Sequence, residues 1–128
     1  MRRIFLAATL SLIVPATGCE EPRPLTVGDK PVDYWVKALQ DSDSKARKKA
    51  ATKLGNVGSA VPSVVPALTG ALKDRDAGVR AEAALALGRI GAAAHEAVPA
   101  LTEAARTDRD AKVRTYAAQA VAKIETAN

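Results

Sequence analysis

Residues 76–91, DAGVRAEAALALGRIG, carry the clearest structural pattern in the chain. Its apolar side chains Val79, Ala83, Leu87 and Ile90 follow the i, i+4, i+8 and i+11 spacing that places them on one stripe of an α-helix. The alternation of polar and apolar residues that is typical of a half-buried strand does not occur here. We therefore predict an α-helix that buries this stripe.

The same pattern occurs three times along the chain, at residues 43–47, 76–80 and 110–114, with offsets of 33 and then 34 residues. Repeats of this length are typical of stacked helical pairs. We predict an all-α fold, a short right-handed α-solenoid of three helical hairpins over about residues 32–58, 59–91 and 92–126. When the three repeats are aligned, the following apolar residues occupy equivalent positions: Trp35, Leu68 and Leu101; Ala50, Ala83 and Ala117; Leu54, Leu87 and Val121; and Val57, Ile90 and Ile124.

Local signals indicate where the helices begin and end. Asp76 precedes the second helix of repeat two, where its carboxylate can accept hydrogen bonds from free backbone amides. Gly91 is typical of a residue that ends a helix. Pro66 and Pro99 fit the first turn of the first helices, because the amide that proline lacks would have no partner there.

Trp35 and the repeated Asp and Arg residues have predicted structural roles. The first helix of repeat one is expected over about residues 32–40, with Trp35 on its buried side, where it would cap the open end of the stack. The aspartates and arginines of the three copies are expected to form ladders between neighbouring turns. These residues are Asp43, Asp76 and Asp110 with Arg47, Arg80 and Arg114.

Composition excludes several functional classes. The chain has 128 residues, with 19 Lys and Arg against 14 Asp and Glu, a net charge of +5 that falls to +3 if Arg2 and Arg3 leave with an export signal. This surplus is too small to indicate nucleic-acid binding by itself. A single Cys and a single His cannot form an internal disulfide or fill the usual metal sites. We expect no catalytic residues, no cofactor and no small-molecule substrate.

The first residues are typical of an export signal, with Arg2 and Arg3 followed by an apolar run too short to span a bilayer. We predict a signal peptide over residues 1–18. Residues 16–19, ATGC, resemble the bacterial lipobox, which implies that Cys19 carries lipid and anchors the exported chain to a bacterial membrane, in the periplasm or at the cell surface. Ala16 stands where the pattern most often has Leu, so ordinary secretion is the alternative. Residues 19–31 are predicted to be an exposed linker.

The second repeat carries a family resemblance. Residues 66–80, PALTGALKDRDAGVR, with the apolar positions that follow to Gly91, resemble HEAT repeats of the bacterial phycobilisome-lyase-like type. The likeness covers about residues 33–125. HEAT arrays are mostly scaffolds that bind partners along a curved surface, so the resemblance implies a module that binds a protein partner and performs no catalysis. Together with the lipobox, this predicts a membrane-tethered scaffold.

Two enzyme groups in this wider family give an alternative. Deoxyhypusine hydroxylases hold two irons through several His-Glu pairs, whereas this chain has one such pair, His95 and Glu96, which aligns with Pro62 and Ser63 of the preceding repeat. One pair cannot supply the ligands of a two-metal site, so no metal ligands are predicted. Phycobilin lyases are longer arrays, and nothing marks a tetrapyrrole pocket here. A degenerate member of either group remains the enzymatic alternative.

The exposed face of the three second helices is the predicted protein-binding surface. Its fifteen positions hold six cations and one acid. We expect a basic face with an apolar centre at Ala81 and Leu85 and an aromatic side chain at Tyr116. The alternatives are a merely solvated face, or attraction to anionic lipid in a spacer that has no specific partner. The candidate binding residues are Lys45, Lys48, Lys49, Ala81, Leu85, Arg89, Lys112, Tyr116, Gln119 and Lys123.

Overall fold

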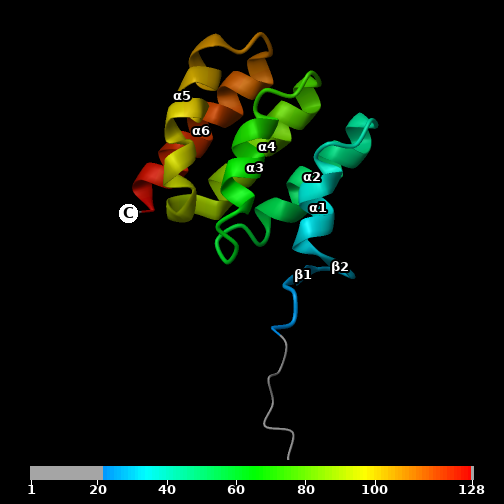
Figure 1. The fold of residues 1–128 in the computed structure, drawn as a ribbon. Coiled ribbons are helices and arrows are strands. Elements are labelled where there is room, and N and C mark those ends of the chain that lie inside the picture. Colours follow the sequence, from blue (N-terminus) through cyan, green and yellow to red (C-terminus); the bar gives the residue numbers. More distant parts are fainter. Residues whose placement is uncertain (1–21, 128) are drawn as a thin grey trace, which may run out of the picture.

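The computed structural model describes residues 22–127, which form a stack of helical hairpins (Figure 1). The predicted signal peptide and Cys19 lie outside the described residues. Within residues 22–127, no helix is long and apolar enough to cross a membrane. The elements are β1 (Thr26–Val27), β2 (Lys30–Pro31), α1 (Val32–Ala38), α2 (Ser44–Gly55), α3 (Val64–Ala71), α4 (Ala77–Ile90), the 3-10 helix η1 (Gly91–Ala97), α5 (Val98–Thr107) and α6 (Ala111–Thr126).

The helices form two layers, with α1, α3 and α5 in the first and α2, α4 and α6 in the second (Figure 1). The second-layer helices pack directly on one another, and α4 lies in the middle. The first-layer helices instead contact mainly the second helix of their own hairpin. This arrangement confirms the predicted all-α solenoid of helical hairpins.

The core lies between the two layers and follows the repeated columns. Leu68 and Leu101 from the first helices are fully buried, as are Leu54 and Leu87 from the second helices. The predicted apolar stripe of α4 is buried, but so is most of the rest of this helix. Because α4 contacts α2 on one side and α6 on the other, its central position buries side chains that the stripe does not include.

Small residues bring the second helices close together. A Cβ atom built on Gly55 would lie 2.8 Å from the Cβ of Ala86, and one built on Gly88 would lie 3.3 Å from the Cα of Ala120. The two contacts are equivalent in the repeat, since each joins a glycine near the end of one second helix to an alanine of the next. The α2–α4 and α4–α6 contacts therefore depend on residues without bulky side chains.

The described part of the predicted linker, residues 22–31, is exposed except at Val27, but it contains a short hairpin that was not predicted. Residues 26–31 form a small antiparallel hairpin in which Thr26 lies opposite Pro31, and Gly28 adopts a φ of +67° in its turn. Val27 is buried, and its carbonyl accepts a hydrogen bond of 3.2 Å from the indole N–H of Trp35. The hairpin joins the fold because the exposed end of the stack needs a cover and the buried indole needs an acceptor. Trp35 is buried at this end, as predicted.

The predicted helix ends are confirmed. The side chains of Asp43, Asp76 and Asp110 each accept a hydrogen bond from a backbone amide in the first turn of α2, α4 and α6, respectively. Gly91 ends α4 with a φ of +70°, a conformation that glycine adopts without strain. Pro99 lies in the first turn of α5. The aspartates thus satisfy amides that the helices leave without intrahelical partners.

Candidate functional site

A ladder of ion pairs joins neighbouring repeats. Arg47 contacts Asp74 through two hydrogen bonds, with Nε at 2.8 Å and Nη2 at 3.0 Å from the two carboxylate oxygens. Arg80 contacts Asp108 in the same way, at 2.9 and 3.1 Å. All four side chains are largely shielded from solvent. Each arginine therefore ties its own repeat to the turn between the two helices of the next repeat.

The predicted ladder named the wrong aspartates. Asp76 and Asp110 cap their own helices, and the acids that cross to the preceding repeat stand two residues earlier, at Asp74 and Asp108. Their carboxylates also accept the backbone amides of the capping aspartates, at 2.9 Å in both turns. The signal was present as an Asp-x-Asp pattern, which Asp41 and Asp43 repeat before α2. Spacing alone could not show which acid of each pair crosses between repeats.

The charges of the ladder are mutually stabilised. Burial by itself would raise the pKa of Asp74, but the hydrogen bonds from Arg47 and from the Asp76 amide outweigh it and lower the pKa below its ordinary value. The hydrogen bond to Asp74 raises the pKa of Arg47. Burial also opposes ionisation of Asp108, and hydrogen bonds from Arg80 and the amide that follows lower its pKa in the same way. The folded protein therefore favours the ionised carboxylates.

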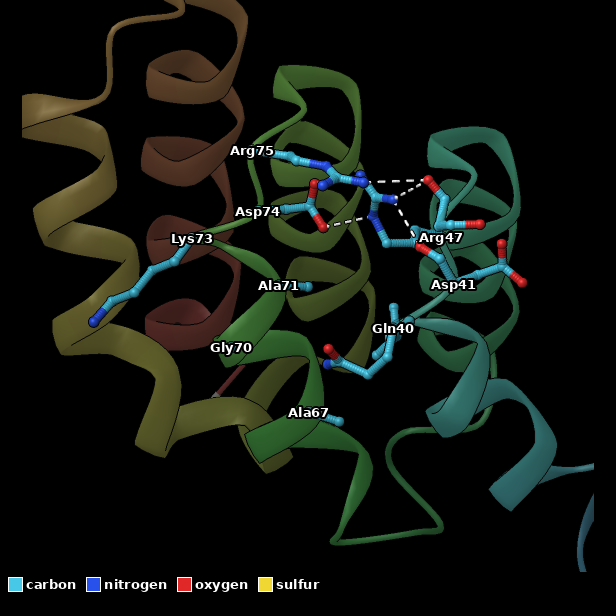
Figure 2. A pocket seen from close by; sticks show the side chains of 11 residues that line it. Gln40, Asp41, Arg47, Ala67, Gly70, Ala71, Lys73, Asp74 and Arg75 are labelled. Carbon is cyan, nitrogen blue, oxygen red and sulfur yellow. Dashed lines mark hydrogen bonds and ion pairs between the residues drawn. The ribbon is translucent and has the colours of Figure 1, made fainter.

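Figure 2 shows a groove beside the first pair, between the turn that precedes α2 and helix α3. Arg47 lies at one wall, where its Nη1 also donates to the backbone carbonyls of Asp41 at 2.7 Å and Ser42 at 3.1 Å. Arg75 reaches across and donates to the same Ser42 carbonyl at 3.2 Å. The two guanidinium groups are therefore bound to the Asp74 carboxylate and to backbone carbonyls of the turn before α2, and these bonds hold the two turns together.

The second-helix face only partly matches its prediction. Leu85 and Tyr116 are half-buried, and Ala81 is buried at 9% exposure. The predicted apolar centre therefore does not include Ala81, which is buried in a helix that packs between α2 and α6. The candidate residues that remain exposed are Lys45, Lys48, Lys49, Arg89, Lys112, Gln119 and Lys123.

Internal contacts largely neutralise the single acid of this face. Glu82 is 9% exposed, and its Oε1 accepts a hydrogen bond of 2.8 Å from the Thr52 hydroxyl. Arg89 approaches the same oxygen at 3.4 Å and remains exposed. Glu82 therefore offers little negative charge to solvent, and cations dominate the exposed part of the face.

Lys49 lies on the second-helix face and also contacts the N-terminal end of the stack. Its ammonium lies 6.0 Å from the centre of the Trp35 ring, and that of Lys53 lies 5.9 Å from the same ring. These distances are within the range of cation–π attraction. A change at Lys49 would therefore alter the N-terminal packing together with the charge of the face.

The single His-Glu pair lies outside this face. His95 and Glu96 are exposed in η1. Across residues 22–127, no group of three or more His, Cys, Asp or Glu side chains is placed to hold a metal ion.

Comparison with known proteins gives a family match over most of the chain. A family model described as HEAT repeats matches residues 32–122. A crystal structure of an engineered protein is similar in fold, with a TM-score of 0.58 and 29% sequence identity over 76% of this chain. The match covers 46% of the engineered protein, so this chain spans less than half its length. No curated protein matches the chain in sequence.

Proposed function

The chain belongs to the HEAT-repeat family, and from that premise we propose that it is a non-enzymatic scaffold that binds a protein partner through the exposed face of α2, α4 and α6. The resemblance of residues 66–91 supports assigning its repeats to the bacterial phycobilisome-lyase-like type. We define the basic face by its exposed cations away from Trp35, which are Lys45, Lys48, Arg89, Lys112 and Lys123.

The shielding of Glu82 is the observation that carries this proposal. The one acid among the face positions is held inside by Thr52 and Arg89, while the cations of the outer helices point to solvent. A face that keeps its cations exposed and its acid covered complements an acidic protein surface. The partner that fits is therefore a protein with a patch of Asp and Glu side chains.

Cross-linking from the basic face tests this function. A photo-reactive residue at Gln119, which is exposed on α6, should capture one dominant acidic protein in cells. Reversal of Lys48, Lys112 and Lys123 to Glu should abolish the capture and leave helix content unchanged, because all three residues are exposed. Capture that survives this triple reversal would contradict the proposal.

A matched control separates the face from net charge. Lys37, Lys73 and Arg109 are exposed and lie outside the second helices. Their reversal to Glu changes the net charge by the same amount as reversal on the basic face. Capture should persist in this control, whereas loss in both variants would indicate a response to total charge.

Membrane tethering is a second part of the proposal and rests on the sequence before residue 22. The export signal and Cys19 would deliver the scaffold to the outer side of a bacterial membrane, where acyl chains on one cysteine give stable anchoring. A Cys19→Ser variant should lose fatty-acid labelling and leave the membrane fraction. A chain that stays unlabelled with Cys19 intact would instead indicate ordinary secretion.

Two measurements distinguish the alternatives. Metal analysis of the purified protein addresses the enzymatic one, since stoichiometric iron would contradict a non-enzymatic scaffold. Binding of the unlipidated domain to vesicles of anionic lipid addresses the spacer, because strong salt dependence would favour attraction to headgroups.

A further inference from the structure

The contacts between repeats leave one position of the ladder unfilled. Arg47 and Arg80 each pair with an aspartate of the following repeat, Asp74 and Asp108. Arg114 is the third arginine of the series and lies on α6 at the far end of the stack (Figure 1). Its Nη1 donates to the Asp108 carbonyl at 2.8 Å, as the other arginines do in their own turns. Among the described residues, no carboxylate lies within ion-pair distance of its guanidinium.

The outer face of α6 also keeps the character of an internal contact surface. Ala118 and Ala122 align with Ala84 and Gly88 of α4, which are buried inside the stack. Ala118 and Ala122 are themselves exposed. The outer face of α6 therefore exposes small side chains and the Arg114 guanidinium at the positions that contact the next repeat inside the stack.

The opposite end of the stack is closed to an identical contact. The hairpin of residues 26–31 covers Trp35 there. Lys53 stands at the position that Ala86 and Ala120 occupy in the later repeats, and these alanines are the residues that approach the glycines of the preceding helix. A lysine at this position keeps another helix from approaching as closely. A second copy therefore cannot add to α6 head to tail in the register of the repeats.

We propose that a second copy of this chain binds the outer face of α6 with its own α6, in antiparallel orientation. At about 3.6 residues per turn, Arg114, Ala118, Ala122 and Glu125 lie on the same side of the helix. Glu125 is exposed, and no ion pair of the described residues involves it. The arginine and the glutamate stand near opposite ends of the helix, separated by about 16 Å.

Charge complementarity selects the antiparallel arrangement. A two-fold axis across the middle of α6 places Arg114 of each copy beside Glu125 of the other, with the exposed alanines between the two ion pairs. A parallel arrangement would place the two arginines together and the two glutamates together, which is unfavourable. The antiparallel contact uses the same surface twice and closes, so it produces a dimer and no filament.

The contact is small, because it involves one helix from each copy. A standard stable interface buries about 800 Å² per partner, and one helix face offers less. The dimer is therefore expected to exchange with monomer and to respond to salt, since two exposed ion pairs contribute to it.

Sedimentation velocity on the purified chain tests the proposal. The sedimentation coefficient should rise from the monomer value towards the dimer value between about 1 μM and about 1 mM protein. Arg114→Glu and Glu125→Arg should each weaken association at least about tenfold. The double variant should recover it, because the charges are exchanged and again complementary. A chain that remains monomeric over this range, or association that neither reversal alters, would overturn the proposal.

Lys73→Glu is the matched control, since Lys73 is exposed and lies outside both α6 and the basic face. It should leave self-association unchanged. Arg114→Glu also removes the Nη1 contact with the Asp108 carbonyl, so Glu125→Arg keeps the test informative if that variant folds poorly. The proposed dimer and the proposed binding of an acidic protein use different sides of α6. Either proposal can therefore be refuted without affecting the other.

Discussion

Replacement of Gly55, Gly88 and Gly70 by alanine makes one chemical change at three helical positions with different surroundings. A Cβ atom at Gly55 would lie 2.8 Å from the Ala86 Cβ and 2.9 Å from its Cα. At Gly88 the nearest atom is 3.3 Å away, and at Gly70 nothing lies within 4 Å. The free energy of unfolding should therefore change with opposite signs at Gly55 and Gly70.

The magnitudes follow from two opposing effects. Alanine in place of glycine inside a helix stabilises by about 1 kcal/mol, and by less at Gly55 because it is the last residue of α2. Overpacking of a close contact costs about 1 to 3 kcal/mol, and the backbone of α4 cannot rotate away as a side chain could. We expect Gly55→Ala to destabilise by about 1 to 2 kcal/mol, Gly88→Ala to change stability by less than about 0.5 kcal/mol, and Gly70→Ala to stabilise by about 1 kcal/mol.

Urea unfolding followed by far-ultraviolet circular dichroism measures these changes, and the fluorescence of Trp35 reports the N-terminal end in the same samples. Parallel thermal scans should show the Gly70→Ala variant melting about 4 to 8 °C above the parent chain. Gly70→Ala also serves as the matched control, since it gains helix propensity without a new contact. If Gly55→Ala proves as stable as Gly70→Ala, the close approach of α2 and α4 is refuted.

Three further results are expected. Asp108→Asn should destabilise by about 2 to 3 kcal/mol, measured by urea unfolding, because it removes a charged hydrogen-bond acceptor from the shielded Arg80 guanidinium; a loss below about 0.5 kcal/mol would contradict the ladder. Folding lowers the pKa values of Asp74 and Asp108, so the ionised carboxylates should stabilise the folded chain fully above about pH 4. This stabilisation should be lost as the pH falls through the folded-state pKa values. In a variant with both residues changed to asparagine, the free energy of unfolding should therefore depend less on pH in the acid range. Trp35→Phe should cost at least about 1 kcal/mol and speed hydrogen exchange around Val27, since the ring remains but the indole hydrogen bond is lost; unchanged exchange would show that this bond does not hold the hairpin.

The helical repeat and the ends of its second helices could be predicted from local sequence patterns. Apolar periodicity and the offsets of 33 and 34 residues located the hairpins, because both depend on contacts within a helix or between equivalent helices. Asp76 and Gly91 could be identified as helix-end residues because capping involves only the nearby backbone.

Which aspartate crosses between repeats, and which surface residues remain exposed, depends on how the hairpins stack. Asp74 and Asp76 occupy the same turn, and the offset between stacked hairpins decides that Asp74 reaches Arg47. Ala81 is buried in α4, which packs between α2 and α6. The hairpin of residues 26–31 could not be predicted from local patterns, since its stability comes from the exposed end of the stack that it covers. Each of these outcomes depends on the distance and offset between elements remote in sequence, which local patterns do not specify.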